Sequence, residues 1–437
     1  MVTTWRRGLG LLPLFLLCWP ISAQQQAFTP SNELNRHLPK WLRFSGDYRA
    51  RLEGFSGGLF RPGNDDLYLL GRVRLNMKIQ PKSWLGFQFQ AQDARIYGRS
   101  QPALPPLAKD SLDLRQAYME IGGADNKAFG LRIGRQEMVF ADQRLIGHVS
   151  WLNGARSFDA VRATARGGGV RLDAWASAVV ALRDGEFNRH VDGDNFHGLY
   201  SSFDKLVPKA TLDAFLFWRT APRRRTEAGA PGKLDFKTPG FRLAGKLPAR
   251  WDYMMLIAGQ TGSLAGDDVR AWAGSWQMGH TLPAKWTPRL SAEYNYATGD
   301  RNPRDGVRGT FDILYPTPHD LYGLADQVGW KNLHHARGGF EMKPGKKLRV
   351  VANYHSWWRA SLEDGLYNAG GALLVSSPGS AAGRHIGQEI DFQAFYSFHS
   401  SLQLAGGVAH IFPGVFLRRV SPGASYTSPY LMLGYSF

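Results

Sequence analysis

The sequence is poor in three features, and each shortage excludes a class of protein. Its single cysteine, Cys18, lies in an N-terminal segment that we expect to be cleaved, so the mature chain needs no disulfide. No apolar stretch beyond that segment reaches the roughly 20 residues of a membrane-spanning helix. Basic residues are numerous but scattered, and their longest run is Arg223-Arg224-Arg225. This spread argues against a nucleic-acid patch.

Catalytic motifs are also missing from the sequence. It has no G-x-S-x-G nucleophile elbow and no H-E-x-x-H zinc motif. His334 and His335 are adjacent, so on a strand they would point to opposite faces and could not share a metal. The segment 192–195, Asp-Gly-Asp-Asn, offers oxygen ligands for calcium, but we interpret it as a solvated turn in a long polar loop. We therefore expect neither an enzyme nor a bound cofactor or metal.

The N-terminus has the pattern of a secretory signal peptide. Arg6 and Arg7 precede a short apolar segment, which ends in small residues at Ala23 before a polar run. We divide the chain into a signal peptide at 1–23, a periplasmic leader at 24–40 and one large unit at 41–437.

The C-terminal stretch indicates what this unit is. Leu431, Leu433, Tyr435 and Phe437 recur every second residue, which places them on one face of a β-strand. An exposed apolar edge strand invites aggregation in a soluble protein. In an outer-membrane β-barrel the last strand pairs with the first, and its apolar face meets lipid. The ending also resembles the signal read by the barrel assembly machinery.

The same alternation recurs along the chain, and it predicts an all-β fold. We expect a transmembrane antiparallel β-barrel of about 18 strands, with short periplasmic turns and long extracellular loops. A soluble β-sandwich or propeller is the alternative. The expected strands lie at 41–53, 69–79, 83–97, 111–121, 127–137, 157–166, 169–182, 197–207, 209–219, 233–247, 250–262, 266–279, 284–299, 330–342, 346–358, 386–399, 400–412 and 424–437. The expected long loops lie at 55–66, 98–110, 138–156, 183–196, 220–232, 300–329, 359–385 and 413–423.

One face of the predicted strands is strongly charged. In the first two strands, six Arg and Lys residues alternate with apolar residues. An Arg or Lys on the lipid face of a barrel costs about 2–4 kcal/mol at the bilayer midplane. Six of them would exceed the usual stability of about 5–15 kcal/mol, so this face must be inside the barrel.

A barrel of 16–18 strands leaves an aqueous channel, and here the channel would be basic. The formal net charge is 53 − 36 = +17. Rings of Arg and Lys favour anions in a pore, although the same charges could pair as a structural network. From the alternation we expect the lumen to be lined by Asp47, Arg49, Arg51, Arg72, Arg74, Lys78, Arg171, Glu293, Arg337, Glu341, Arg349, Glu389 and Asp391. Arg115, Arg132, Arg135, Arg156 and Arg162 are further expected members of this lining, although the alternation defines their facing less clearly.

Several segments carry a more specific signal. They are Glu293–Asp300, Gly309–Pro316, Gly134–Glu137, Arg156–Ala160 and Gly406–Phe416. In combination they resemble the alginate export family of outer-membrane barrels, over most of the chain from Phe44 to Phe437. The resemblance implies a monomeric 18-stranded barrel of the bacterial outer membrane, with an arginine-rich constriction that passes an anionic polysaccharide.

The resemblance also implies which residues form the constriction. The segments of Arg49, Arg51, Arg72, Arg74, Arg135 and Arg156 match the family's inward basic positions, and Asp47 and Glu137 would be their acidic partners. There is one departure. Alginate-exporting relatives carry a long periplasmic turn that plugs the pore, whereas the turn at Phe398–Ser401 is very short.

Three functions are consistent with these observations. The first is passive export of an anionic, alginate-like polyuronate through an arginine-lined pore in the outer-membrane lipid, together with periplasmic export partners. The second is uptake of small organic anions or oligosaccharides by an anion-selective porin. The third is an envelope-embedded enzyme, for which the sequence offers no nucleophile–base pair.

Overall fold

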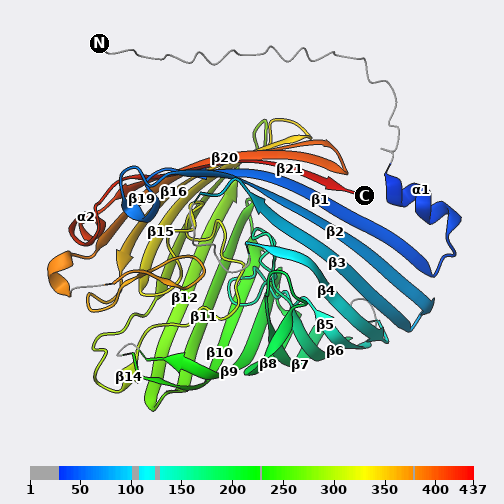
Figure 1. Cartoon of the computed structure of the whole chain (residues 1–437), viewed down its shortest axis with the longest axis horizontal. Coiled ribbons are helices and arrows are strands. Elements are labelled where there is room, and N and C mark those ends of the chain that lie inside the picture. Colours follow the sequence, from blue (N-terminus) through cyan, green and yellow to red (C-terminus); the bar gives the residue numbers. More distant parts are fainter. Residues whose placement is uncertain (1–28, 101–107, 124–127, 227–228, 377–378) are drawn as a thin grey trace, which may run out of the picture.

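The barrel predicted from the alternation is present. A computed structural model describes residues 29–100, 108–123, 128–226, 229–376 and 379–437, so the predicted signal peptide with Cys18 lies outside the described residues. Within them, eighteen antiparallel strands form a closed ring, and a two-residue strand, β14, adds a parallel pairing beside β12 (Figure 1). None of the described helices is long and apolar enough to cross a membrane.

The strands and helices have the following bounds. The ring consists of β1 (Leu42–Phe55), β2 (Asp66–Lys82), β3 (Leu85–Tyr97), β4 (Asp110–Ile121), β5 (Phe129–Gln136), β6 (Phe158–Gly167), β7 (Val170–Ala181), β8 (Arg189–Val207), β9 (Ala210–Arg225), β10 (Pro231–Leu247), β11 (Trp251–Leu264), β12 (Asp267–Thr281), β13 (Arg289–Ala297), β15 (Leu333–Met342), β16 (Leu348–Arg359), β19 (His385–His399), β20 (Leu402–Pro413) and β21 (Tyr426–Ser436). The remaining elements are α1 (Pro30–His37), α2 (Val415–Val420), η1 (Gly58–Phe60), η2 (Ser380–Ala382), β14 (Val307–Arg308), β17 (Leu366–Tyr367) and β18 (Leu373–Val375).

The ring closes between its first and last strands. β1 and β21 pair antiparallel from Asp47 opposite Ser436 to Glu53 opposite Tyr430. Closure removes the edge that the apolar C-terminal strand would otherwise expose. The prediction of a closed transmembrane barrel is therefore confirmed.

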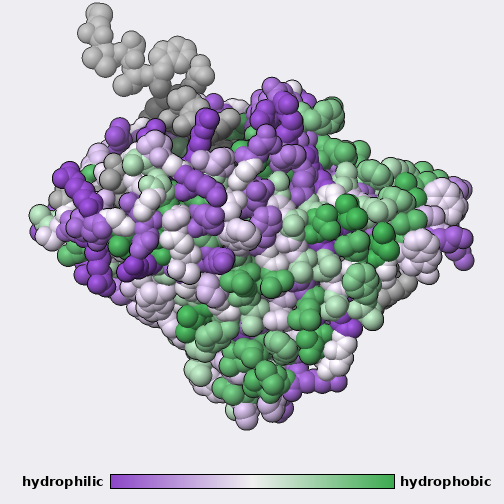
Figure 2. All heavy atoms as spheres, turned by 90° about the horizontal axis from the view of Figure 1, so that it is seen from below, coloured by the Kyte–Doolittle hydropathy of each residue, from purple (hydrophilic) through white to green (hydrophobic). Residues whose placement is uncertain are grey.

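Alternation sorts the side chains between lipid and lumen as expected. On β2, Leu67 and Leu75 point outward and are 60% and 53% exposed, whereas Arg72 and Arg74 point inward and are 7% and 6% exposed. Figure 2 shows large hydrophobic patches on the outer wall and hydrophilic residues gathered toward the left end, where Figure 1 places the long connectors. Lipid contact thus explains the apolar face of each strand.

The connectors alternate in length, with differences from the prediction. Gly168 and Gly169, with φ of 62° and 89°, make a two-residue turn between β6 and β7 that favours glycine at both positions. The predicted loops at 183–196 and 220–232 are mostly strand, because β8, β9 and β10 continue into them as paired strands. The expected turn at 192–195 therefore lies inside β8, where Asp194 ion-pairs with Arg224 at 2.8 Å. Residues 101–107 of the predicted loop at 98–110 lie outside the described residues.

The leader contains a helix that completes the seam of the barrel. Beyond the last β1–β21 pair, Gly46 and Phe437 exchange two backbone hydrogen bonds of 2.7 and 2.9 Å. Next along β1, the backbone N–H of Phe44 donates to Asn35 Oδ1 of α1 at 2.9 Å, and Asn35 Nδ2 donates to Phe44 O at 2.7 Å. The Asn35 amide therefore pairs with β1 as a further residue of β21 would.

Candidate functional site in the barrel lumen

Two long connectors fold into the lumen and join there. Lumen loop 1 (residues 137–157) links β5 to β6, and lumen loop 2 (residues 298–332) links β13 to β15. They meet as two parallel segments, in which Tyr315 donates from its backbone N–H to Leu145 O at 2.9 Å and accepts from the Gly147 N–H at 2.8 Å. Thr317 adds a third backbone bond, to Gln143 O, at 2.9 Å. Each loop thus satisfies buried backbone groups of the other, as burial requires.

Aromatic side chains anchor both loops to one side of the wall. The lumen faces of β6 to β10 present Phe158, Trp175, Phe196, Tyr200, Phe215, Phe217 and Phe236, each at most 8% exposed. Tyr315 of loop 2 lies 4.9 Å from Phe196, and Phe140 of loop 1 lies 4.9 Å from Trp175, ring centre to ring centre. This side of the lumen is apolar because it covers loops instead of facing water. Burial of such rings contributes about 1.5–3 kcal/mol each.

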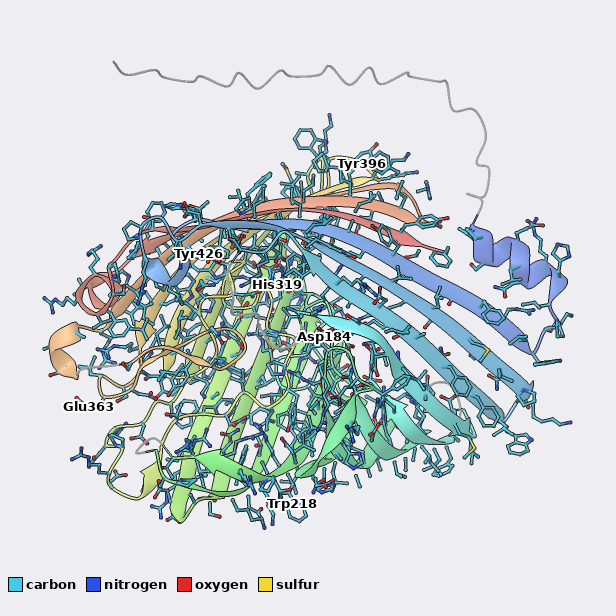
Figure 3. The ribbon with its side chains drawn as sticks, viewed as in Figure 1. Asp184, Trp218, His319, Glu363, Tyr396 and Tyr426 are labelled. Atoms are coloured by element: carbon cyan, nitrogen blue, oxygen red, sulfur yellow. The ribbon has the colours of Figure 1, made fainter. Side chains whose placement is uncertain are left out.

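A ring contact also links the two loops near the opposite wall. Trp151 of loop 1 stacks on His319 of loop 2 with ring centres 3.7 Å apart. Figure 3 shows His319 inside the ring of strands and Trp218 on the wall. The loops are therefore tied at two places, once by backbone bonds and once by stacked rings.

The opposite wall carries the predicted basic residues in register. On the lumen faces of β1 and β2, Arg43 lies opposite Lys78, Asp47 opposite Arg74, and Arg49 opposite Arg72. Successive lumen-facing residues of a strand are about 6.8 Å apart. These residues, with Arg51 above them, form a ladder that we name the basic rail.

The upper part of the rail holds lumen loop 1 by its backbone. Arg49 donates to Ser150 O at 2.8 Å and to Asn153 Oδ1 at 3.1 Å. Arg72 also donates to Ser150 O, at 3.1 Å, and ion-pairs with Asp47 at 3.0 Å. A wall that is basic and a loop that presents carbonyl oxygens are therefore complementary.

Arg51 completes this grip and has a second partner. Its Nη1 donates to Trp151 O at 2.6 Å, and its guanidinium lies 3.7 Å from the centre of the Trp151 ring. Its Nε lies 2.7 Å from Glu53. Arg51 is thus neutralised by an acid while it fixes the loop.

Four basic members of the rail lack an acidic partner. In the part of the chain that the structure describes, Arg49 and Arg74 in its upper part and Arg43 and Lys78 in its lower part form no ion pair. Arg74 donates only to Gln92, at 2.8 Å, and its Nη2 has no partner there. The neighbouring Arg115 of β4 is paired with Glu137, whereas the sequence predicts Glu137 as a partner of the constriction arginines, among which Arg115 is not included. The rail therefore carries uncompensated positive charge.

The other predicted residues are distributed around the lumen. Arg171 pairs with Asp173 at 2.6 Å, Glu293 lies 3.6 Å from Arg337, and Arg349 lies 3.3 Å from Glu341. Arg156 in loop 1 donates to Pro316 O of loop 2 at 3.1 Å. These residues face the lumen but belong to separate networks, away from the rail.

Arg135 differs from the prediction. On β5 it shares its face with Phe129 and Ile133, which are 56% and 38% exposed, and it pairs with Asp159 at 2.8 Å. It therefore lies on the outward face and does not line the lumen. Its position at the extracellular end of β5 places its charge near water, which removes the cost that a midplane arginine would carry.

Burial and neighbouring charges shift the pKa values of two titratable groups in the lumen loops. Asp312 of loop 2 pairs with Arg219 of β9 at 2.7 Å. Burial opposes ionisation of Asp312, but Arg219 and Arg308 outweigh it and lower its pKa to about 2. Burial, with help from Arg115 and Arg74, lowers the pKa of His148 in loop 1 to about 4. Asp312 is thus charged and His148 neutral at physiological pH.

Arg144 of loop 1 forms a deeply buried ion pair in the lumen. Its Nη2 lies 2.6 Å from Glu293 of β13, and the two side chains are 3% and 1% exposed. Arg144 also donates to Asn295 Oδ1 at 3.1 Å and to the Tyr322 hydroxyl at 3.4 Å. Burial opposes the charge of Arg144, but Glu293 raises the pKa of its guanidinium. Arg144 therefore ties loop 1 to the wall and to loop 2.

A third connector, between β16 and β19, packs on lumen loop 2 through its residues 360–376. The Gly329 N–H donates to Tyr367 O at 2.8 Å, and the Asp300 N–H donates to the Asp364 carboxylate at 2.9 Å. Asn332 also donates to Ser361 O at 3.1 Å. Loop 2 is thus held from above as well as from the wall.

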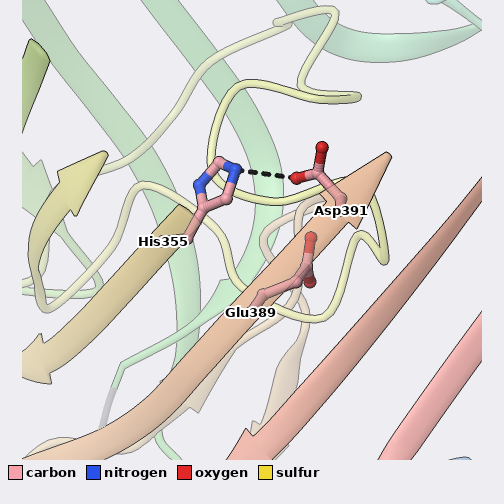
Figure 4. Close-up of side chains that lie close together, drawn as sticks. All are labelled: His355, Glu389 and Asp391. Carbon is pink, nitrogen blue, oxygen red and sulfur yellow. Dashed lines mark hydrogen bonds and ion pairs between the residues drawn. The ribbon is translucent and has the colours of Figure 1, made fainter. Parts of the chain in front are cut away.

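One group of described residues has the composition of a metal site. His355 of β16 and Glu389 and Asp391 of β19 are at most 1% exposed, and their nearest ligand atoms lie within 4.8 Å of one another (Figure 4). The directions of the surrounding hydrogen bonds decide whether a ring nitrogen of His355 has a lone pair available for a metal. Arg144 and Glu293 fix the Asn295 amide, so that its Nδ2 donates to His335 Nδ1 at 2.9 Å.

The direction of this hydrogen bond fixes the directions of the next two, from His335 to His355 and from His355 to Asp391. A neutral His335 that accepts at Nδ1 carries its proton on Nε2, and this donates to His355 Nδ1 at 2.9 Å. His355 must in turn carry its proton on Nε2, which donates to Asp391 at 2.9 Å. His355 therefore has no free lone pair for a metal, and the group is a buried hydrogen-bonded network. His335 and His334 do point to opposite faces, as predicted.

Sequence reasoning missed Arg144, Arg219, Asp312 and His355. Three of them lie in or contact loops without periodicity, so no alternation marks them. His355 follows the inward parity of Arg349 on β16 and could have been assigned to the lumen. Its partnership with His335 depends on the register of β15 and β16.

Comparison with known proteins supports this architecture. The sequence profile of the alginate export family matches residues 40–430. A comparison with curated proteins gives no match. Among solved structures, Pseudomonas aeruginosa OpdO is similar, with a TM-score of 0.61, 12% identity and coverage of 92% of this chain and 99% of that chain. P. aeruginosa OccK2 (OpdF) in complex with glucuronate gives a TM-score of 0.60, 10% identity and coverage of 91% and 98%. At these identities the likeness concerns the fold alone.

Proposed function

This chain belongs to the alginate export family, and from that premise we propose that it exports an anionic, alginate-like polyuronate. The family and the closed barrel are those of an outer-membrane channel, and the cargo is the part that we propose. Transport would be passive, with no catalytic step. A monomeric state, insertion by the barrel assembly machinery and periplasmic export partners remain predictions.

The basic rail is the observation that carries this proposal. Arg49 and Arg74 have no acidic partner among the described residues, and both face a lumen narrowed by two loops. A uronate carboxylate could supply the missing negative charge, because guanidinium binds carboxylate at any physiological pH. Asp47 beside Arg72 would weaken each contact, so that a chain with repeated carboxylates is passed along instead of retained.

A second candidate function is uptake of small organic acids. It is favoured by the joined lumen loops, which narrow the passage below what the ring of strands would allow. The similar OccK2 is described in complex with glucuronate, a single uronate sugar. Both candidate functions need a basic lumen. They are therefore distinguished by the length of the solute that passes through the channel.

Single-channel recording in a planar bilayer tests the proposal. Reversal potential in a salt gradient reports ion selectivity, and current block by added uronate oligomers reports entry of the cargo. Arg74→Gln removes a charge without touching loop 1, whereas Arg49→Gln also removes two loop contacts. Arg135→Gln is the matched control, because that arginine lies on the outward face.

We expect anion selectivity and block by acidic but not neutral oligomers. R74Q and R49Q should each weaken the block several-fold, and R135Q should leave it unchanged. Block that strengthens with oligomer length indicates polymer export, since a longer chain contacts several rungs of the rail. Passage of monomers with exclusion of longer oligomers indicates small-acid uptake. Weak selectivity without block would contradict both.

A further inference from the structure

Amide side chains run beside the basic rail. On β3, Gln88, Gln90 and Gln92 alternate toward the lumen, opposite Lys78, Asn76 and Arg74 of β2. Cationic and amide groups therefore form two parallel tracks with a common spacing of about 6.8 Å. A carboxylate needs a cation, whereas sugar hydroxyls need groups that both donate and accept, as amides do.

The two tracks end at a cavity beneath α1. This cavity, at the periplasmic end of the seam, has a volume of about 530 Å³, within the range of about 300–1,000 Å³ that is typical of small-molecule sites. Its wall is contributed by α1, by β1 to β4 and by the C-terminal residue. The lining side chains include Ser31, Asn32, Lys78, Gln88, Gln116 and Tyr118.

The amides differ in whether they are free to bind a solute. Gln90 is bonded to Asn76, and Gln92 is bonded to Arg74, Asp110 and Gly154 O. Gln88 makes only one bond among the described residues, from Nε2 to Phe89 O at 3.0 Å, so its Oε1 is free. The upper glutamines are therefore structural, and the lowest is open to the cavity.

Two further groups at this level have no partner. Within the described part of the chain, neither the Lys78 ammonium nor the Asn32 side-chain amide makes a hydrogen bond or ion pair, and both line the cavity. Asn35, by contrast, is committed to the backbone of Phe44. The cavity thus presents the Lys78 ammonium, which has no partner, beside two amides with unused hydrogen-bonding capacity. A second cation, Arg43, also lines it but already donates to the backbone oxygens of Pro39 and Leu42.

We propose that this cavity is a binding site for a sugar acid. Lys78 pairs with the carboxylate, and the amides of Gln88 and Asn32 bind the ring hydroxyls. The inference rests on the proposed function and deepens it: the channel selects hydroxylated acids over plain carboxylates at its periplasmic end. A plain carboxylate would satisfy Lys78 but leave the amides without a solute partner, and sites that hydrogen-bond a hydroxyl discriminate against analogues lacking it.

The test compares two acids of equal charge. Glucuronate and cyclohexanecarboxylate both carry one carboxylate on a six-membered ring, but only glucuronate has hydroxyls. Each is added on the periplasmic side of the channel in a bilayer, and its dissociation constant is taken from current block. We expect glucuronate to bind about ten-fold more tightly, the effect of one or two net hydrogen bonds.

Three variants test which residues cause the preference for glucuronate over cyclohexanecarboxylate. Gln88→Leu and, on the separate element α1, Asn32→Ala should each weaken glucuronate and leave cyclohexanecarboxylate unchanged. Lys78→Gln should weaken both acids equally. Gln403→Leu is the control, because this exposed glutamine of β20 is not part of the cavity lining.

The outcomes separate this inference from the function on which it rests. Equal binding of the two acids, unchanged by Q88L and N32A, would overturn the sugar-acid site but leave an anion channel. No block by either acid, together with weak anion selectivity, would overturn both. Since Asn32 lies on α1 and outside the barrel wall, N32A keeps the test decisive even if Q88L fails to fold.

Discussion

Replacing Arg144 by methionine should release lumen loop 1. Methionine keeps an unbranched side chain of similar reach but removes the ion pair with Glu293 at 2.6 Å and the bond to Asn295 at 3.1 Å. Glu293 is 1% exposed in this pair, so its charge would stay buried without its main partner. Breaking a buried pair by removing one partner costs about 3–5 kcal/mol.

The lower end of that range applies here. Glu293 keeps Arg337 at 3.6 Å and accepts from Asn295 at 2.9 Å, which compensates part of the lost interaction. A loss of about 3 kcal/mol raises the ratio of released to locked loop roughly 100-fold. The aromatic contacts of Phe140 and the backbone bonds to Tyr315 remain, so we expect transient release and not unfolding of the barrel.

Current noise in single-channel recordings measures this release. R144M should show frequent excursions to a higher conductance, and the double variant R144M/E293Q should suppress most of them because the deeply buried carboxylate of Glu293 is then replaced by a neutral amide. Arg171→Met is the control: its partner Asp173 keeps Arg162 at 2.8 Å, and among the described residues Arg171 makes no hydrogen bond or ion pair with either lumen loop. If folded R144M is as quiet as the unmodified channel, the aromatic wall alone holds the loop and the reasoning from the ion pair is wrong.

Two further predictions concern pH and the seam. Because the pKa of His148 is lowered to about 4, His148 stays neutral down to about pH 5, and we expect its replacement by glutamine to leave anion selectivity between about pH 7 and 5 unchanged. The unfolded chain takes up this proton near pH 6.5, so the free energy of unfolding should fall as the pH falls from about 6.5 to 4, and H148Q should reduce that slope in thermal unfolding. Asn35→Ala removes both bonds to Phe44 and should lower stability by about 1–3 kcal/mol, seen as a lower temperature for loss of the folded gel band, whereas Asn32→Ala should leave that temperature unchanged.

The barrel could be predicted because lipid and lumen impose opposite polarity on neighbouring residues. The clean alternation of Arg49 and Arg51 with Ala50 and Leu52 gives both the strand and its facing. The same rule fails at Arg135, where β5 leaves the apolar layer and an outward arginine costs little. It also fails to describe residues 214–218, Ala-Phe-Leu-Phe-Trp, which are apolar on both faces of β9.

The arrangement of the lumen could not be predicted in the same way. Phe215 and Phe217 are apolar although they point inward, because the lumen loops cover them. The sequence of β9 alone does not indicate which segments of the chain cover it. The contact between residues 145–147 and 315–317 joins segments that are distant in the sequence and have no periodicity. The role of Arg49 and Arg72 as holders of loop 1 follows only from that contact. Lumen-facing residues were therefore identifiable from sequence, but their partners were not.

The meeting of the two lumen loops has a consequence for how such channels diversify. The bonds between residues 143–147 and 315–317 run through backbone atoms, which every residue except proline supplies equally. Substitutions of the surrounding loop side chains can therefore accumulate without parting the loops or altering the ring of strands. Descendants of one ancestral barrel could in this way acquire new solutes by point mutation inside the lumen, while the surface that meets lipid stays under its own, separate selection.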